Sequence, residues 1–293
     1  MKQPNYVCGA LSTIKETKAA FHYPDGAPMI VTHRGDWSAS SENSLDAVRR
    51  SIRQGVDMVE ADVQKTKDGF LILMHDSSVD RMTNGRGRIW EMTLDEIRAL
   101  RLLSGNGRGD PALTDRTVPT LEDVLQLIKG AILLNLDKCW PYREEAYALL
   151  ERTDTVEQVV FKSTAPPDEV ADFLSGKRKR PEYICVIDLS DPSMLTQLER
   201  IVHDIRPPAI ELIFNEQQLP LLDSGVIRQI RGHSRVWVNA MWGSLCGGLG
   251  EDSPGLSMQE GWGSLLEMGV NMIQTDHPRE LLRFLRQKHM SAF

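Results

Sequence analysis

The residues best suited to chemistry stand at the ends of short apolar runs. His33 follows one such run, Glu60 and Asp62 end the next, and His75 follows a third. Side chains alternate along a strand, so the two carboxylates point to the same face. Imidazole titrates near neutrality, and carboxylate oxygens are the ligands that hard cations prefer. The pattern therefore indicates proton transfer by the two histidines beside a bound divalent cation.

A third carboxylate, Asp137, ends the apolar run that follows in the sequence. With the earlier pair it would form an all-oxygen metal site, which suits Mg²⁺ or Ca²⁺ better than zinc. Arg34, together with Lys162 or Lys138, would supply the cations that a phosphoryl group requires as charge builds in the transition state. The constellation predicts phosphoryl chemistry.

Eight apolar runs alternate with longer segments of helical periodicity from residue 29 onward. This alternation is typical of βα units around a parallel sheet, and it predicts an α/β fold of the (β/α)8 TIM-barrel type. The carboxyl ends of such strands carry the active site. The expected strands are Met29–Thr32, Asp57–Asp62, Ile132–Asp137, Gln158–Lys162, Tyr183–Ile187, Ala209–Phe214, Arg235–Asn239 and Asn271–Thr275. The expected helices between them are Ser44–Gln54, Glu144–Arg152, Asp168–Ser175, Pro192–Asp204, Leu221–Arg231, Met258–Met268 and Pro278–Lys288.

The second and third runs are separated by far more chain than a βα unit requires. We interpret approximately residues 64–118 as an inserted segment, opened by a hairpin whose returning strand is Phe70–Met74. The insertion also contains a predicted helix at Thr93–Leu103, and a further helix begins at Thr120. Residues 1–293 are then a single barrel domain, with a variable N-terminal helix within residues 1–28.

Two further regions carry weaker signals. Asp80 and Arg81 are expected to pair with each other inside the insertion, and Asp276 is expected to fix the loop after the eighth strand. The glycine-rich region Trp242–Gly261 follows the seventh strand, where a barrel enzyme carries substrate loops. We expect its acidic part, residues 247–253, to form a flexible lid.

The net charge and the lengths of the apolar stretches indicate which kinds of binding partner this protein can have. The formal net charge is -7, which argues against the basic surface that a nucleic-acid-binding protein needs. No stretch approaches the roughly 20 apolar residues of a membrane span, so stable membrane insertion is not expected. The beginning of the chain lacks the apolar run of a secretory signal. We therefore expect a cytoplasmic location, or a periplasmic or secreted one if a leader was trimmed.

The order of several motifs resembles that of the glycerophosphodiester phosphodiesterase family. The matching segments run through nearly the whole chain: His33-Arg34-Gly35, Ser41-Glu42-Asn43-Ser44-Leu45, Glu60-Ala61-Asp62-Val63, Asp68-Gly69, His75-Asp76, Asp80-Arg81, Pro119-Thr120-Leu121-Glu122 and Thr275-Asp276-His277-Pro278. The resemblance implies a barrel with an insertion after the second strand, one divalent cation, and hydrolysis of a small-molecule glycerophosphodiester to glycerol phosphate and an alcohol.

By motif position, the resemblance assigns His33 and His75 to the acid/base pair and Arg34 to a phosphate contact. Glu60 and Asp62 would bind the metal ion. The seventh strand and its loop carry two indoles, Trp237 and Trp242. Which of them faces the substrate is left open by the sequence, and both are candidates for lining the substrate pocket.

The third metal ligand is where the chain departs from the family pattern. Members present an acidic residue, a spacer and a lysine on the third strand, whereas this chain has Asn135, Leu136, Asp137 and Lys138. Either Asp137 or Asn135 takes the ligand position. We favour Asp137 because a carboxylate neutralises a divalent ion and an amide does not. Strand alternation then directs Lys138 away from the site, which leaves Lys162 as the cation.

Two alternative functions are compatible with these residues. One is a lysophospholipase D or sphingomyelinase D-like phosphodiesterase that acts on lipids, and the other is a non-catalytic phosphodiester-binding protein. The sequence shows no basic or apolar membrane-binding segment, which counts against the first. The pair His33 and His75 counts against the second, because a binding protein needs no proton-transfer groups. Oligomeric state does not follow from the sequence.

Overall fold

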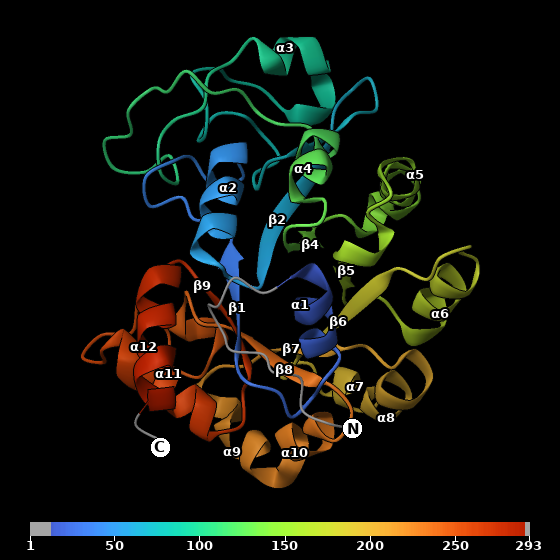
Figure 1. The fold of residues 1–293 in the computed structure, drawn as a ribbon, viewed down its shortest axis with the longest axis vertical. Coiled ribbons are helices and arrows are strands. Elements are labelled where there is room, and N and C mark those ends of the chain that lie inside the picture. Colours follow the sequence, from blue (N-terminus) through green and yellow to red (C-terminus); the bar gives the residue numbers. More distant parts are fainter. Residues whose placement is uncertain (1–12, 291–293) are drawn as a thin grey trace.

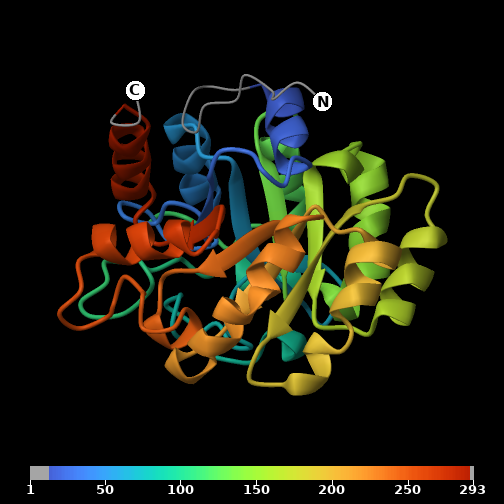
Figure 2. The ribbon, with the colours of Figure 1, turned by 90° about the horizontal axis from the view of Figure 1, so that it is seen from below.

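A closed parallel barrel forms the centre of the protein, which was analysed as a computed structural model that describes residues 13–290. Within these residues, eight parallel strands follow the order β1-β9-β8-β7-β6-β5-β4-β2, and pairing of β1 with β2 closes the ring. The predicted TIM barrel is confirmed, and helices surround it (Figures 1 and 2). The barrel strands are β1 Met29–His33, β2 Met58–Lys65, β4 Leu133–Asp137, β5 Val159–Ser163, β6 Glu182–Asp188, β7 Ala209–Ile213, β8 Arg235–Asn239 and β9 Met272–Thr275.

The outer helices follow the predicted segments, with two exceptions. They are α1 Ile14–Phe21, α2 Leu45–Gln54, α4 Leu121–Ile128, α5 Arg143–Thr153, α6 Pro167–Ser175, α7 Pro192–Leu195, α8 Leu198–Arg200, α9 Leu219–Leu221, α10 Ile227–Arg231, α11 Met258–Glu267 and α12 Pro278–Met290. The two continuous helices expected at Pro192–Asp204 and Leu221–Arg231 are each interrupted. In the second, Gly225 has a φ of 107°, which no regular right-handed helix contains.

Helix α4 shows how local sequence sets these elements. The Thr120 side chain accepts a hydrogen bond from the Asp123 amide at 3.1 Å, and the Asp123 carboxylate accepts one from the Thr120 amide at 2.9 Å. This reciprocal cap satisfies two amides at the start of the helix. Four apolar side chains at helical spacing are then buried against the barrel: Leu121, Val124, Leu125 and Ile128.

The interior of the barrel is divided into an apolar layer and a polar layer. The lower, apolar layer includes Val31, Met58, Leu133, Val160, Ala209, Trp237 and Met272. Two residues further along the same strands stand His33, Glu60, Asn135, Lys162, Glu211, Asn239 and Gln274, all buried. A spacing of two keeps a side chain on the same face of its strand. Seven of the eight strands therefore supply one apolar residue to the base and one polar residue to the level above it. In β6 both positions are apolar, Ile184 and Val186.

The inserted segment forms a small lobe above α2 and α4 at the top of Figure 1. Its strand β3, Leu71–Leu73, pairs antiparallel with the end of β2, and its short helix α3 spans Leu94–Arg98. The helix is shorter than the predicted Thr93–Leu103. The lobe has its own apolar core, composed of Ile72, Met74, Val79, Met82, Ile89, Leu94, Ile97, Leu102 and Val118.

The amino end of the barrel is closed by α1. Phe21, the last residue of this helix, packs into the apolar layer. The buried guanidinium of Arg235 donates to the carbonyl oxygen of Ala20 at 2.7 and 3.0 Å, to that of Ala27 at 3.0 Å and to that of Asn271 at 3.1 Å. One side chain of β8 therefore satisfies carbonyl groups from three segments. Residues 1–12 lie outside the described structure, and no helix among residues 13–290 has the length and hydropathy of a membrane span.

We predict that Arg235→Met lowers the free energy of unfolding by about 3 to 5 kcal/mol, because it leaves buried polar groups without their partner. Urea unfolding followed by circular dichroism measures this loss. The matched control is Arg231→Met, which removes a partly exposed ion pair with Asp25 at 3.1 Å. That substitution should cost less than about 1 kcal/mol. Equal losses in the two variants would contradict the role given to Arg235.

Candidate active site

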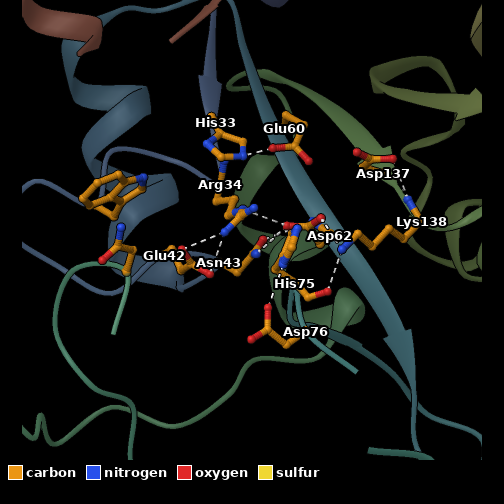
Figure 3. Close-up of polar contacts among 12 residues, drawn as sticks. His33, Arg34, Glu42, Asn43, Glu60, Asp62, His75, Asp76, Asp137 and Lys138 are labelled. Carbon is orange, nitrogen blue, oxygen red and sulfur yellow. Dashed lines mark hydrogen bonds and ion pairs between the residues drawn. The ribbon is translucent and has the colours of Figure 1, made fainter. Parts of the chain in front are cut away.

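Three carboxylates converge at the carboxyl ends of β2 and β4. Glu60 and Asp62 come from β2, and Asp137 ends β4 directly opposite Asp62 in the parallel register. One oxygen from each lies within 4.8 Å of the others (Figure 3). An all-carboxylate donor set of this kind fits a hard divalent cation. The structure thus brings together the three residues predicted as metal ligands.

Burial and mutual repulsion shape the electrostatics of this cluster. Burial, followed by the charge of Asp62, raises the pKa of Glu60 to about 8. Glu60 accepts a hydrogen bond from the Arg34 amide at 3.0 Å and one from Gln274 at 3.4 Å. The cluster therefore retains a proton near neutrality, and a bound cation would compete with that proton for the carboxylate.

Lys162 is a buried cation below the cluster. Its Nζ lies 3.3 Å from Asp137 Oδ2 and 3.1 Å from Glu211 Oε2. Burial would lower the pKa of Lys162, but the charges of Asp137 and Glu211 outweigh it and raise that pKa above its ordinary value. Burial would likewise raise the pKa of Asp137, and Lys162 reverses the direction. Lys162 therefore holds Asp137 ionised from beneath.

Lys138 reaches the site, contrary to the expectation from strand alternation. β4 ends at Asp137, and Lys138 adopts a left-handed backbone conformation with a φ of 56°. This turn brings its Nζ to 3.7 Å from Asp62 Oδ1 and to 2.7 Å from the carbonyl oxygen of His75. Alternation did not predict this direction because it holds only while the strand continues.

His33 is held by a carboxylate from the opposite end of the chain. Its Nδ1 is hydrogen-bonded to Asp276 Oδ1 at 2.8 Å, and Trp37 Nε1 donates to the same oxygen at 3.3 Å. Burial would lower the pKa of His33, but the hydrogen bond to Asp276 and the charges of Glu60 and Asp276 raise it overall. No hydrogen bond in the described part of the chain involves Nε2 of His33, so that atom is left for a ligand.

His75 is held in the same way from the inserted side. Its Nδ1 is hydrogen-bonded to Asp76 Oδ1 at 2.7 Å. Arg81 donates to both oxygens of Asp76, at 2.8 and 2.9 Å, and this contact keeps the pKa of Asp76 well below its usual range. Both histidines are therefore hydrogen-bonded through Nδ1 to the carboxylate of an aspartate.

Arg34 spans two acidic residues beside the cluster. Its Nη1 donates to both oxygens of Glu42, at 2.9 and 3.0 Å, and its Nε lies 3.2 Å from Asp62 Oδ2. Arg34 and Asn43 both have positive φ, 57° and 52°, and the Asn43 amide group exchanges two hydrogen bonds with Asp62. The turns after β1 therefore hold Arg34 against the carboxylates, with Nη2 in no hydrogen bond to a described residue.

These groups enclose a cavity of about 320 Å³. Both histidines and Arg34 line it, and its other lining residues are Trp37, Glu42, Asp76, Arg81, Asn106, Arg108, Trp242 and Asp276. Its volume is in the range of small-molecule sites. The arrangement places two imidazoles and a guanidinium around one space beside a carboxylate cluster.

The two predicted substrate tryptophans have different positions. Trp242 is 39% exposed, lines the cavity and packs edge-to-face against the His33 ring, with 5.2 Å between ring centroids. Trp237 is 0% exposed and belongs to the apolar layer, where Lys162 Nζ lies 5.4 Å from its ring centroid. The expectation that Trp237 lines the pocket is wrong, because its side chain points into the closed base of the barrel.

Asn135 lies one level deeper than Asp137 on β4. Its Oδ1 is buried without a hydrogen-bond partner, while its Nδ2 donates to the carbonyl oxygen of Val160 at 3.1 Å. In the parallel register it stands opposite Glu60. Asn135 therefore has a free oxygen near the cluster, but it is Asp137 whose carboxylate completes the three-carboxylate group.

Sequence reasoning missed the position of Arg81 in the site. Arg81 pairs with Asp76 and Glu42 and lines the cavity, so the expected pair with Asp80 is wrong. Asp80 instead accepts the Gly87 amide at 2.9 Å. The sequence does contain a signal for Arg81, because its motif segment, Asp80-Arg81, follows closely after His75-Asp76.

The fold and the site together define a TIM-barrel protein with a cluster of three carboxylates and with two histidines around one cavity. The chain belongs to the glycerophosphoryl diester phosphodiesterase family, whose family model matches residues 33–206. A second family model, described as a domain of unknown function, matches residues 183–285.

Curated relatives match parts of the chain. A glycerophosphodiester phosphodiesterase of Caldanaerobacter subterraneus is 42% identical over 100 residues, which cover 34% of this chain and 40% of that protein. Glycerophosphodiester phosphodiesterase 1 of Bos taurus is 31% identical over 170 residues, which cover 57% and 47%. The chain thus spans less than half the length of either relative.

Solved structures match nearly the whole barrel. A glycerophosphoryl diester phosphodiesterase from Parabacteroides distasonis has a TM-score of 0.71 at 20% identity, with 96% of this chain and 94% of that chain covered. An Oleispira antarctica phosphodiesterase, in complex with the product sn-glycerol-3-phosphate, has a TM-score of 0.63 at 18% identity, with 89% and 97% covered. At these identities the likeness shows the fold.

We predict that the affinity for Ca²⁺ rises with pH up to about 8. Glu60, with a pKa of about 8, must lose its proton to bind an ion. Below that pH the Kd should rise by about tenfold for each unit by which the pH falls, which is the limit for one proton that competes with the ion. Titration calorimetry from about pH 6 to pH 9 in two buffers of different ionisation enthalpy measures both the Kd and the released proton. Glu60→Gln should bind more weakly and lose this dependence, and a constant Kd in the unaltered protein would contradict the assignment.

Proposed function

We propose that this chain hydrolyses glycerophosphodiesters to glycerol 3-phosphate and an alcohol, with His33 and His75 as the acid/base pair. One observation carries the proposal. Both histidines line a single cavity beside the carboxylate cluster, and each has its Nδ1 on an aspartate, which leaves Nε2 for the substrate. Family membership and the names of the curated relatives support this choice of substrate class.

The two imidazoles can divide the proton transfers of a phosphodiester cleavage. One accepts the proton of the attacking nucleophile, which is water or the neighbouring hydroxyl of glycerol, and the other donates a proton to the alcohol oxygen that leaves. Attack by water gives glycerol 3-phosphate directly. Attack by the glycerol hydroxyl gives a cyclic phosphate, which a water molecule must then open with the two imidazoles in exchanged roles. The Asp276 and Asp76 carboxylates orient His33 and His75 for these transfers. Water must reach the phosphorus from the cavity, which the Trp37 and Trp242 side chains border.

The cations of the site suit a phosphoryl group. Arg34 lines the cavity and can donate from Nη2 to a nonbridging oxygen. Lys138 lies beside Asp62 and is the partly exposed lysine of the cluster, the role predicted from the sequence for Lys162. Lys162 is too deeply buried for a substrate contact, and its contribution is to hold Asp137 in place.

Glu60, Asp62 and Asp137 would hold one divalent cation, Mg²⁺ or Ca²⁺. When bound, such an ion supplies positive charge for the nonbridging oxygens of the phosphodiester. The three-carboxylate donor set supports this assignment, because hard cations prefer such ligands. The charge of Asp62 also contributes, after burial, to the raised pKa of Glu60, as expected where carboxylates lie close together.

We predict that His33→Ala and His75→Ala each lower kcat for glycerophosphocholine by at least about 100-fold, because each removes a proton-transfer group. Removal of the metal ion with EDTA should lower the rate to a similar extent. A coupled enzymatic assay for glycerol 3-phosphate measures the product. The control is His233→Ala, because this exposed histidine lies outside the cavity.

The same assay separates the alternatives. Faster release of choline from lysophosphatidylcholine than from glycerophosphocholine would favour a lipid phosphodiesterase. Binding of glycerophosphocholine by calorimetry without product in any metal would indicate a non-catalytic binding protein. Full activity in both histidine variants would refute the proposed chemistry.

We predict that Asp137→Ala weakens Ca²⁺ binding by about 100-fold or more, whereas Asn135→Ala weakens it by less than about tenfold. The reason is that only the Asp137 substitution removes a negative charge from the three-carboxylate group. Calorimetric titration of both variants at one pH measures the difference. The reverse order would assign the third ligand to Asn135.

A further inference from the structure

The glycine-rich loop between β8 and α11, residues 240–257, is fastened to the end of β9. Glu251 lies near its middle and accepts three hydrogen bonds through its carboxylate. The donors are the Thr275 hydroxyl, the Asp276 amide at 3.2 Å and the Trp262 indole at 3.1 Å. The Glu251 amide also donates to the carbonyl oxygen of Ala240 at 2.7 Å. Four hydrogen bonds therefore join Glu251 to neighbouring segments, and the flexible lid expected at residues 247–253 stays a prediction.

Glu251 is hydrogen-bonded to Asp276, which in turn is hydrogen-bonded to His33. β9 ends at Thr275, so Asp276 lies beyond the strand and its amide has no strand partner. Glu251 accepts that amide, while the Asp276 side chain accepts from His33 Nδ1 at 2.8 Å. The contacts form one chain from Glu251 through the backbone of Asp276 to the imidazole.

The same loop touches the imidazole from a second side. Trp242 packs edge-to-face against the His33 ring, with an interplanar angle of 85°. The Gly243 amide donates to Asp252 Oδ1 at 2.6 Å, which ties the Trp242 end of the loop to the residue after Glu251. One segment therefore fixes both the ring face of His33 and, through Asp276, its Nδ1.

We propose that Glu251 is a positioning residue, which places Asp276 so that Asp276 fixes the orientation and the Nδ1–H tautomer of His33. A histidine whose Nδ1–H is held by a carboxylate presents an unprotonated Nε2 when neutral, and the partner of Nδ1 decides this arrangement. Glu251 itself does not line the cavity. The consequence for turnover rests on the proposed function, whereas the tautomer of His33 does not.

The first test compares variants of Glu251 in the Ca²⁺-loaded enzyme. Glu251→Ala should lower kcat for glycerophosphocholine by about 10- to 100-fold, as small displacements of a catalytic group do, with KM changed less than about threefold. Glu251→Gln should restore much of kcat, because its amide oxygen can still accept the Asp276 amide. If Glu251→Ala does not fold, Glu251→Asp keeps the charge, shortens the reach and should also lower kcat.

The matched control for lost stability is Asp57→Ala. Asp57 is also a carboxylate that accepts a backbone amide, that of Ile30 at 2.7 Å, but it lies at the amino end of β2, opposite the site. This variant should lower Tm while kcat stays within about twofold of the unaltered enzyme. An equal loss of kcat in Asp57→Ala and Glu251→Ala would overturn the proposal.

A double-substitution cycle tests the route of the effect. If Glu251 acts through Asp276, then Glu251→Ala should change kcat by less than about twofold once Asp276→Asn is already present. Two effects that multiply would show that Glu251 acts independently of Asp276 and would overturn the proposal.

The ¹⁵N resonances of the His33 ring test the proposal without turnover. In protein labelled with ¹⁵N-histidine and assigned by the loss of signal in His33→Gln, neutral His33 should carry its proton on Nδ1. Glu251→Ala should shift the ring toward a mixture of tautomers, and Asp57→Ala should not. An unchanged tautomer in Glu251→Ala would overturn the positioning role. If the unaltered protein hydrolyses no glycerophosphodiester, the proposed function fails while this measurement still decides the role of Glu251.

Discussion

The mutual repulsion of buried carboxylates is the constraint on which the site depends. Glu60, Asp62 and Asp137 place three oxygens within 4.8 Å of one another, and of these residues Glu60 and Asp62 are buried while Asp137 is partly exposed. Lys162 and Arg34 lie against Asp137 and Asp62 and offset part of this charge. Burial, and after it the charge of Asp62, raises the pKa of Glu60 to about 8, and the excess of negative charge would attract a cation. The proposed cation, when bound, would remove part of the repulsion that the fold otherwise has to tolerate, and it would thereby stabilise the protein.

The layered interior of the barrel lets the fold accommodate the negative charge of the carboxylate cluster. The apolar base, with Trp237 and Met58, closes the barrel below the cluster and excludes water from that side. Lys162 rests between Trp237 and the carboxylates, where it is paired with both Asp137 and Glu211. A polar level above an apolar one follows from the two-residue repeat of each strand. The same repeat that builds the core therefore also aims the functional side chains at one point.

The parts of the site outside the strands depend on turns and on long-range hydrogen bonds. Arg34, Asn43 and Lys138 all have positive φ, and each turns a side chain toward the cluster immediately after a strand or near it. Positive φ costs free energy in a residue other than glycine, so the hydrogen bonds of these side chains must offset it. Asp276 and Glu251 show the same dependence at the other end of the chain, where they connect β9 and the glycine-rich loop to His33.

The sequence by itself determined the barrel, the three carboxylates and the two histidines, because strand alternation and short motifs are local properties. It also determined the helix that starts at Thr120, through a cap only three residues long. Only the tertiary structure decided which partners those residues have. His33 and Asp276 meet where β1 and β9, the first and last strands of the barrel, pair with each other, which no local pattern records. The direction of Lys138 and the burial of Trp237 depend on where a strand ends and at which level of the barrel a residue lies. These are properties of the closed sheet, and spacing along the chain does not contain them.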